Sequence, residues 1–168
     1  MRPVRAFTLT VLILAALGVL AGLLWSHLSP RAPYTVAGTE TVLADPSTQA
    51  LIAADGWFAV VTGGLGLASG LAVWLLNRRE GQLEALLGLC VGGALAAFLA
   101  YWAGSTFTLG VVTVEAAAQP GLKVVPGSLD LTARGVLVSW PLAAVFVFGL
   151  LEGLHGYRES PLRNPMGL

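Results

Sequence analysis

Four long apolar stretches constrain this chain more than any other feature of its sequence. Each holds about 20 residues, and the only charged residues inside them, Glu84 and Glu152, lie near an end. A helix needs about 20 mostly apolar residues to cross the hydrocarbon core of a bilayer. We therefore predict an all-α membrane protein whose four transmembrane helices cover about residues 6–28, 57–76, 83–104 and 135–154.

The composition excludes the main alternatives. Only 11% of the 168 residues are charged and 56% are hydrophobic, whereas a soluble domain carries about a quarter charged residues. So few charges cannot coat a soluble globule, and so apolar a chain is not disordered. Nine basic residues balance nine acidic ones, which disfavours nucleic-acid binding. Residues 1–168 are expected to form a single integral membrane domain.

The basic residues predict an orientation. Six belong to the two ends of the chain and to the short connection between the second and third stretches: Arg2, Arg5, Arg78, Arg79, Arg158 and Arg163. The other three belong to two longer loops, at about residues 29–56 and 105–134: Arg31, Lys123 and Arg134. Connections rich in Arg and Lys stay in the cytoplasm. Both termini are therefore expected in the cytoplasm, with the two longer loops outside a bacterial plasma membrane. The first stretch exceeds a signal-peptide core of about 7–15 residues, so we interpret it as an uncleaved span.

Tryptophan residues stand near the ends of the predicted spans. Four fall at outer ends and Trp74 at an inner end; the outer ones are Trp25, Trp57, Trp102 and Trp140. Because the amphipathic indole ring prefers the headgroup level, we predict these five residues as interface anchors.

The first outer loop predicts a hairpin and a short helix. Residues 34–36 and 41–43 are rich in β-branched side chains and flank a turn. Asp45 followed by Pro46 is typical of a helix start, with Asp45 as the N-cap. Asp55 is predicted to end this short helix and to cap the second span.

The second outer loop predicts another hairpin, in which a turn at residues 126–127 joins 122–125 to 128–132. Thr132 is the predicted cap of the fourth span. The two loops together would form a small extracytoplasmic cap of short β-hairpins and a short helix on a four-helix bundle.

Small residues recur four positions apart in every span. Such spacing lets helix backbones approach closely in a membrane. We interpret these residues as packing positions inside the bundle, the alternative being that one stripe contacts a partner subunit or a second copy. They are Gly18, Gly22, Gly66, Gly70, Gly88, Gly92, Ala96, Ala100, Gly104, Gly149 and Gly153.

The ionisable residues give little indication of a catalytic or metal-binding function. Glu84 and Glu152 are expected to form interfacial pairs with nearby basic residues, Glu84 with Arg78 and Arg79, and Glu152 with His155 and Arg158. Cys90 is the only cysteine, which excludes an intrachain disulfide and a cysteine zinc site. The outer carboxylates match no calcium loop, and no catalytic motif is present. We expect no catalytic residue, no cofactor and no metal.

Three short motifs point to a family. Residues 43–46 (LADP), residues 53–58 (AADGWF) and Arg78–Arg79 resemble a group of small four-span actinobacterial membrane proteins that share a domain of unknown function. The likeness covers the first hundred residues best and fades in the second outer loop. It implies an actinobacterial inner-membrane protein and assigns no catalytic residue.

Three functions fit these patterns. The first is a non-enzymatic accessory or assembly subunit of a larger envelope or respiratory complex, which would act through helix packing and outer-loop contacts with a membrane-protein partner. The second is a small transporter, channel or lipid-binding protein that works as a homo-oligomer. The third is an envelope enzyme, which would require Asp45, Asp55 and Asp130 to converge on one cleft.

Overall fold

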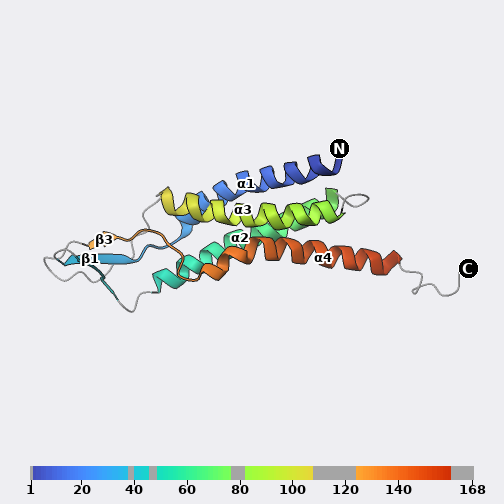
Figure 1. The fold of residues 1–168 in the computed structure, drawn as a ribbon. Helices are drawn as coiled ribbons and strands as arrows, with labels where there is room; N and C mark the ends of the chain where they lie inside the picture. Colours follow the sequence, from blue (N-terminus) through green and yellow to red (C-terminus); the bar gives the residue numbers. More distant parts are fainter. Residues whose placement is uncertain (1, 38–39, 46–48, 77–81, 108–123, 160–168) are drawn as a thin grey trace, which may run out of the picture.

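The chain folds into four long helices with a small sheet at one end (Figure 1). The structure is a computed structural model and describes residues 2–37, 40–45, 49–76, 82–107 and 124–159. The helices are α1 (Arg2–Leu28), α2 (Ala50–Leu76), α3 (Gln82–Thr106) and α4 (Ser139–Glu159), the last preceded by the 3₁₀ helix η1 (Arg134–Val138). The strands are β1 (Pro33–Ala37), β2 (Glu40–Leu43) and β3 (Val124–Pro126). The start of α1 and the end of α4 lie together at the end away from the sheet (Figure 1).

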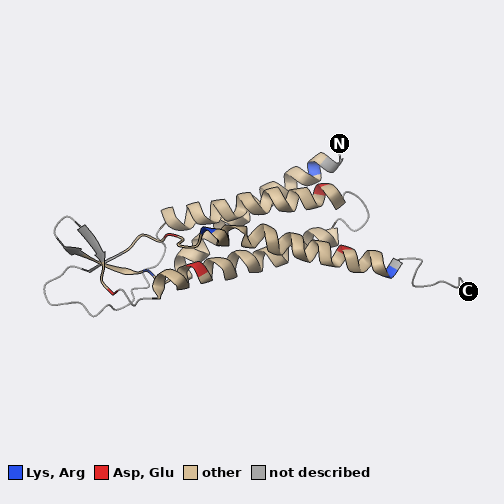
Figure 2. Cartoon of the chain, turned by 60° about the horizontal axis from the view of Figure 1, so that its bottom comes forward, with Lys and Arg blue, Asp and Glu red and all other residues tan. Residues whose placement is uncertain are grey.

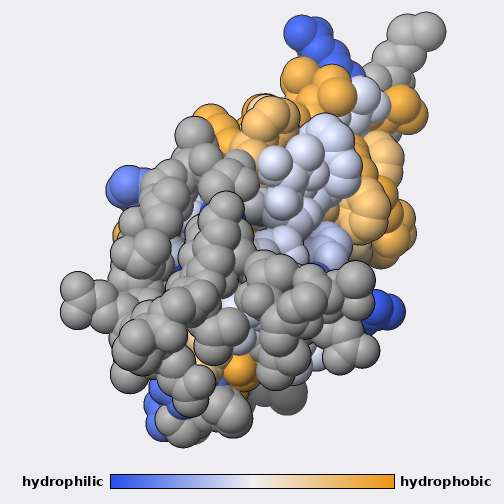
Figure 3. Space-filling view, turned by 90° about the vertical axis from the view of Figure 1, so that its left-hand side faces the viewer, coloured by the Kyte–Doolittle hydropathy of each residue, from blue (hydrophilic) through white to orange (hydrophobic). Residues whose placement is uncertain are grey.

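All four helices are long and apolar enough to cross a membrane, which confirms the four predicted segments. Their charged residues lie toward the two ends of the bundle, and the middle of each helix carries none (Figure 2). The chain thus has the build of a multi-pass membrane protein. Viewed from the sheet end, the described surface shows pale and blue residues beside orange, hydrophobic ones (Figure 3).

The helices pack as two pairs, α1 with α3 and α2 with α4, and α3 joins the pairs through α4. Within each pair the helices run in the same direction. Gly18 faces Ala96 and Gly22 faces Ala100 in the first pair, a register that advances together along both helices. The predicted small-residue stripes of α1 and α3 therefore lie at the contact between these two helices.

The sheet has the order β2-β1-β3, with both pairings antiparallel. Tyr34 in the central strand lies opposite Leu43 on one side and Val125 on the other. The predicted second hairpin is wrong in its described part, because β3 pairs with β1 and residues 127–131 form no strand. The alternation of Leu129 and Leu131 has another cause: both side chains are buried in the core of the bundle.

Helix α2 corrects the prediction for the first outer loop. It runs without interruption from Ala50 to Leu76, so the predicted break after Asp55 is wrong. Gly56 is exposed and its Cα faces open space, which makes it a tolerable position within a helix. Asp45 lies before the first residue of α2, and residues 46–48 lie outside the described residues, so its role as a cap stays a prediction.

Candidate functional site

The densest group of buried side chains lies where the bundle meets the sheet. Trp25 is fully buried there, and its indole Nε1 donates a hydrogen bond of 2.9 Å to the carbonyl oxygen of Ala54. Its ring contacts Phe58 edge to face, with centroids 5.0 Å apart. These contacts attach the last turns of α1 to the first turns of α2.

Two of the five predicted interface anchors are therefore wrong. Trp25 and Trp140 have no exposed surface, because the neighbouring helices cover both rings. Trp57 and Trp102 are 41% and 51% exposed, and their role as anchors stays a prediction. Trp74 is partly buried and donates its N–H to Glu152.

The stripe of α3 packs on α1 over its whole length. Ala96 and Ala100 are fully buried. A methyl group added at Gly22 would lie 2.9 Å from the carbonyl carbon of Ala100, closer than real side chains come. The remaining small residues of this stripe face α1 in the same way: Gly88 faces Thr10, Gly92 faces Leu14, and Gly104 faces Trp25.

The stripe of α2 packs on α4, but the one predicted in α4 itself does not pack within the chain. A methyl group at Gly66 would lie 2.6 Å from the carbonyl oxygen of Trp140, and Gly70 is similarly close to Ala144. Gly149 and Gly153 are exposed and have open space where a side chain would begin. Their prediction as packing residues within the bundle is wrong, because they lie on the face of α4 turned away from α2.

Hydroxyl groups join α2 to the start of α4. Thr62 is fully buried, and its Oγ1 lies 2.5 Å from Oγ of Ser139 and 2.6 Å from the carbonyl oxygen of Phe58. Ser139 in turn donates a hydrogen bond of 2.7 Å to the carbonyl oxygen of Val136 in η1. This chain of hydrogen bonds fixes the turn through which η1 enters α4.

Two carboxylates hold the segment that leads into η1. Both oxygens of Asp55 accept backbone N–H groups, from Thr132 at 3.0 Å and Ala133 at 2.9 Å. Asp130 accepts from the hydroxyl of Tyr101 and from the N–H of Leu131, both at 2.8 Å. Asp55 is thus a cap, but for the turn before η1 rather than for α2. Thr132 is not the cap of this turn, because Ala133 occupies the N-cap position.

Arg31 is a buried cation that the sequence did not indicate. Only 6% of its surface is exposed, and its Nη2 lies 3.3 Å from Oγ of Ser26. Its Nε, together with Oγ of the buried Ser29, has no hydrogen-bond partner in the described part of the chain. Ser26 donates to the carbonyl oxygen of Phe107 at 2.7 Å, so this polar group links the end of α1 to the end of α3.

The opposite end of the bundle is organised by Glu152. Its two oxygens accept hydrogen bonds from Trp74 Nε1 at 3.2 Å and from Gln82 Nε2 at 2.6 Å. The prediction that Glu152 pairs with His155 or Arg158 is wrong, because neighbouring helices α2 and α3 supply its partners instead. The predicted partners of Glu84, Arg78 and Arg79, lie outside the described residues.

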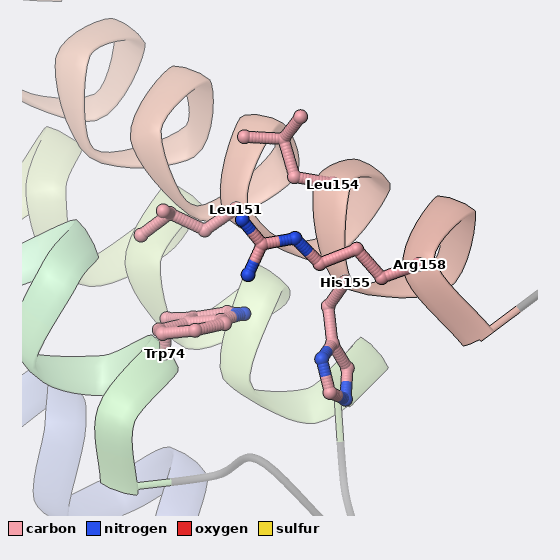
Figure 4. A pocket seen from close by; sticks show the side chains of 5 residues that line it. All are labelled: Trp74, Leu151, Leu154, His155 and Arg158. Carbon is pink, nitrogen blue, oxygen red and sulfur yellow. The ribbon is translucent and has the colours of Figure 1, made fainter.

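Two cavities flank Glu152. One, of about 170 Å³, lies between α2 and α4 and is lined by Trp74, Leu151, Leu154, His155 and Arg158 (Figure 4). The other, of about 400 Å³, lies between α3 and α4 and is lined by Gln82, Leu83, Leu86, Phe148, Gly149, Glu152 and Gly153. The exposed glycines of α4 therefore form part of a groove.

The site residues together define a bundle of four helices long and apolar enough to cross a membrane, with a polar junction to a small sheet. Among the residues that the structure describes, no three His, Cys, Asp or Glu side chains are grouped to hold a metal ion. No protein-family model matches the sequence, and the comparisons with curated proteins and with solved structures return no match. The resemblance to the actinobacterial four-span proteins stays a prediction.

Proposed function

We propose that this protein is a non-enzymatic accessory or assembly subunit of a larger membrane complex, which acts by contact. It would reside in the plasma membrane of an actinobacterium-like bacterium, with both termini in the cytoplasm and the sheet outside as an extracytoplasmic cap. The observation that carries the proposal is the junction described above, in which side chains of α1, α2 and α3 hold the segments next to the sheet. Such a junction presents the sheet as a fixed platform rather than as a loose loop.

The sheet offers a means of contact. Among the strands that the structure describes, β2 and β3 are the outer ones, and outer strands present backbone groups to which another chain adds a strand. In the membrane, Gly149 and Gly153 offer a second contact, since small residues admit the close approach of a partner helix. Both surfaces support a partner protein over a small-molecule substrate.

The alternative, a transporter or channel built from several copies, draws less support. A transporter or channel of this kind would need the small-residue stripe of α3 to form the contact between copies. Gly92 packs instead on Leu14 and Ala96 packs on Gly18, both within one chain. The open face of α4 is the remaining place where a second copy would dock.

The test is purification from native membranes in mild detergent, followed by mass spectrometry of the proteins that remain bound. Gly149→Leu is expected to reduce the amount of the main co-purifying protein at least threefold. Gly64→Leu is the matched control, because Gly64 is also an exposed helix glycine with open space around it. A strictly monomeric protein that retains no partner under native expression would refute the proposal. A defined homodimer would favour the alternative.

A further inference from the structure

A small cavity at the end of the bundle where α1 begins and α4 ends combines a cation with an apolar floor. It has a volume of about 170 Å³ and lies between the last turns of α2 and α4. In Figure 4 the guanidinium of Arg158 turns back over the cavity, with Leu151 on one side and the ring of Trp74 below it. The ring of His155 meets Trp74 edge to face, with centroids 6.3 Å apart.

The charge at this cavity is positive. A guanidinium carries a permanent charge and a rigid fork of donors that match phosphate oxygens. None of the described residues that line the cavity is a carboxylate. Glu152, on the same helix, already accepts hydrogen bonds from Trp74 and Gln82. The cavity therefore suits an anion.

The surroundings of the cavity suit hydrocarbon. Leu75, Leu76, Leu150 and Leu154 are each about half exposed or more, and they lie on the two helices that border the cavity. Trp74 stands in the last turn of α2 beside Leu75 and Leu76, and indole rings prefer the headgroup level of a bilayer. A cation next to exposed leucines near the end of the bundle suits a phospholipid, whose phosphate adjoins its acyl chains.

We propose that this cavity binds the phosphate headgroup of an anionic phospholipid, in the leaflet at the end of the bundle where α1 begins and α4 ends. Its volume is below the roughly 300–1,000 Å³ of a pocket that encloses a drug-sized ligand, so it accepts a headgroup while the acyl chains lie along the exposed leucines. The proposal does not depend on the contact function proposed above.

Arg158 must supply most of the attraction. It stands in the last turn of α4, where the negative end of the helix dipole repels an anion. Neutralising this residue should therefore remove the selectivity for anionic lipid rather than weaken it slightly. One basic residue near an anionic surface is worth about fivefold in affinity.

The experiment reconstitutes the full chain in nanodiscs of zwitterionic phosphatidylcholine with increasing phosphatidylglycerol, then measures the lipids retained after mild detergent extraction by native mass spectrometry. The wild-type protein should retain phosphatidylglycerol about fivefold over phosphatidylcholine, and Arg158→Gln should reduce this ratio to near one. Leu151→Trp keeps the charge but fills the cavity, and it should lower the retention of phosphatidylglycerol by a similar factor.

Arg5→Gln is the matched control, because Arg5 is an exposed arginine of α1 outside the cavity lining. It should leave the ratio unchanged. Equal losses in Arg5→Gln and Arg158→Gln would overturn the proposal, since they would indicate a diffuse charge effect. Retention unaffected by Leu151→Trp would overturn it too, as would displacement of the lipid by an equal concentration of inorganic phosphate. Variants are compared only after each elutes as a single folded species.

Discussion

The indole N–H of Trp25 donates a 2.9 Å hydrogen bond to the carbonyl oxygen of Ala54, and this bond joins two helices that are separated by the whole first loop. Trp25 has no exposed surface, and its ring also contacts Phe58. One side chain thus fixes both the spacing of α1 and α2 and the base from which β1 leaves the bundle.

Trp25→Phe should destabilise the protein by about 1–3 kcal/mol. The substitution removes one hydrogen bond, which contributes about 1 kcal/mol, and leaves a smaller ring in a closely packed site. The midpoint of unfolding in a detergent titration measures the effect. Trp102→Phe is the control and should change the midpoint little, because Trp102 is half exposed. Equal effects of the two substitutions would contradict the buried position of Trp25.

Gly22 and Gly149 occur in similar sequence patterns, but substitution by alanine should affect the stability of the protein differently at the two positions. Gly22→Ala should destabilise the bundle by about 1–3 kcal/mol, because the added carbon meets the backbone of Ala100 and the two helices must separate. Gly149→Ala meets nothing within the chain, and the higher helix propensity of alanine should leave stability unchanged or raised by up to about 1 kcal/mol.

Thermal unfolding of the isolated chain, with both variants in the same detergent, checks this pair. A stable Gly22→Ala protein would show that α1 and α3 do not approach as closely as the structure has them. A strongly destabilised Gly149→Ala protein would indicate a second chain on that face of α4.

Gly22 and Gly149 also show which parts of the fold could be predicted from the sequence and which could not. Hydropathy and four-residue spacing are local patterns, so they predicted the four helices and the stripes of Gly18, Gly22 and Gly88. Which helix covers a stripe depends on the arrangement of all four, and nothing near Gly149 in the sequence indicates that its face stays open.

The burial of individual side chains could not be predicted from local sequence patterns either. Trp25 and Trp57 occupy similar positions at the ends of predicted spans, yet one is enclosed by neighbours and the other faces outward. Asp55 followed by Gly56 is a typical helix-breaking pair, and the helix continues because the carboxylate binds backbone groups of a segment far along the chain. No local pattern indicated that Arg31 is buried.

Asp55→Asn should loosen the entry to α4 without unfolding the bundle. The carboxylate accepts two N–H groups, from Thr132 and Ala133, whereas an amide has one accepting oxygen and turns an NH₂ group toward the second donor. The loss should be about 1.5–3 kcal/mol, the range for hydrogen bonds to a charged group.

Hydrogen exchange at residues 131–138 measures this local effect, which should appear as faster exchange there and unchanged exchange in the middle of α3. Glu84→Gln, at the other end of the bundle, provides a carboxylate control that should leave exchange at residues 131–138 unaltered. If exchange accelerates equally in every helix, Asp55 stabilises the whole bundle rather than one turn.

Arg31→Met should leave stability unchanged or increase it. A buried cation without a carboxylate carries a desolvation penalty of several kcal/mol, and the described contact that offsets it is a single 3.3 Å approach to Oγ of Ser26. Methionine keeps much of the volume and removes the charge, and replacement of buried ionic groups by apolar ones is often neutral or stabilising by about 1–4 kcal/mol. Ser26 retains its bond to the carbonyl oxygen of Phe107.

Thermal unfolding of Arg31→Met beside Arg31→Lys measures the sign of the stability change, since the lysine variant keeps the charge and should gain no stability. A loss of more than about 2 kcal/mol in Arg31→Met would instead indicate that an anionic group holds the guanidinium in the native protein.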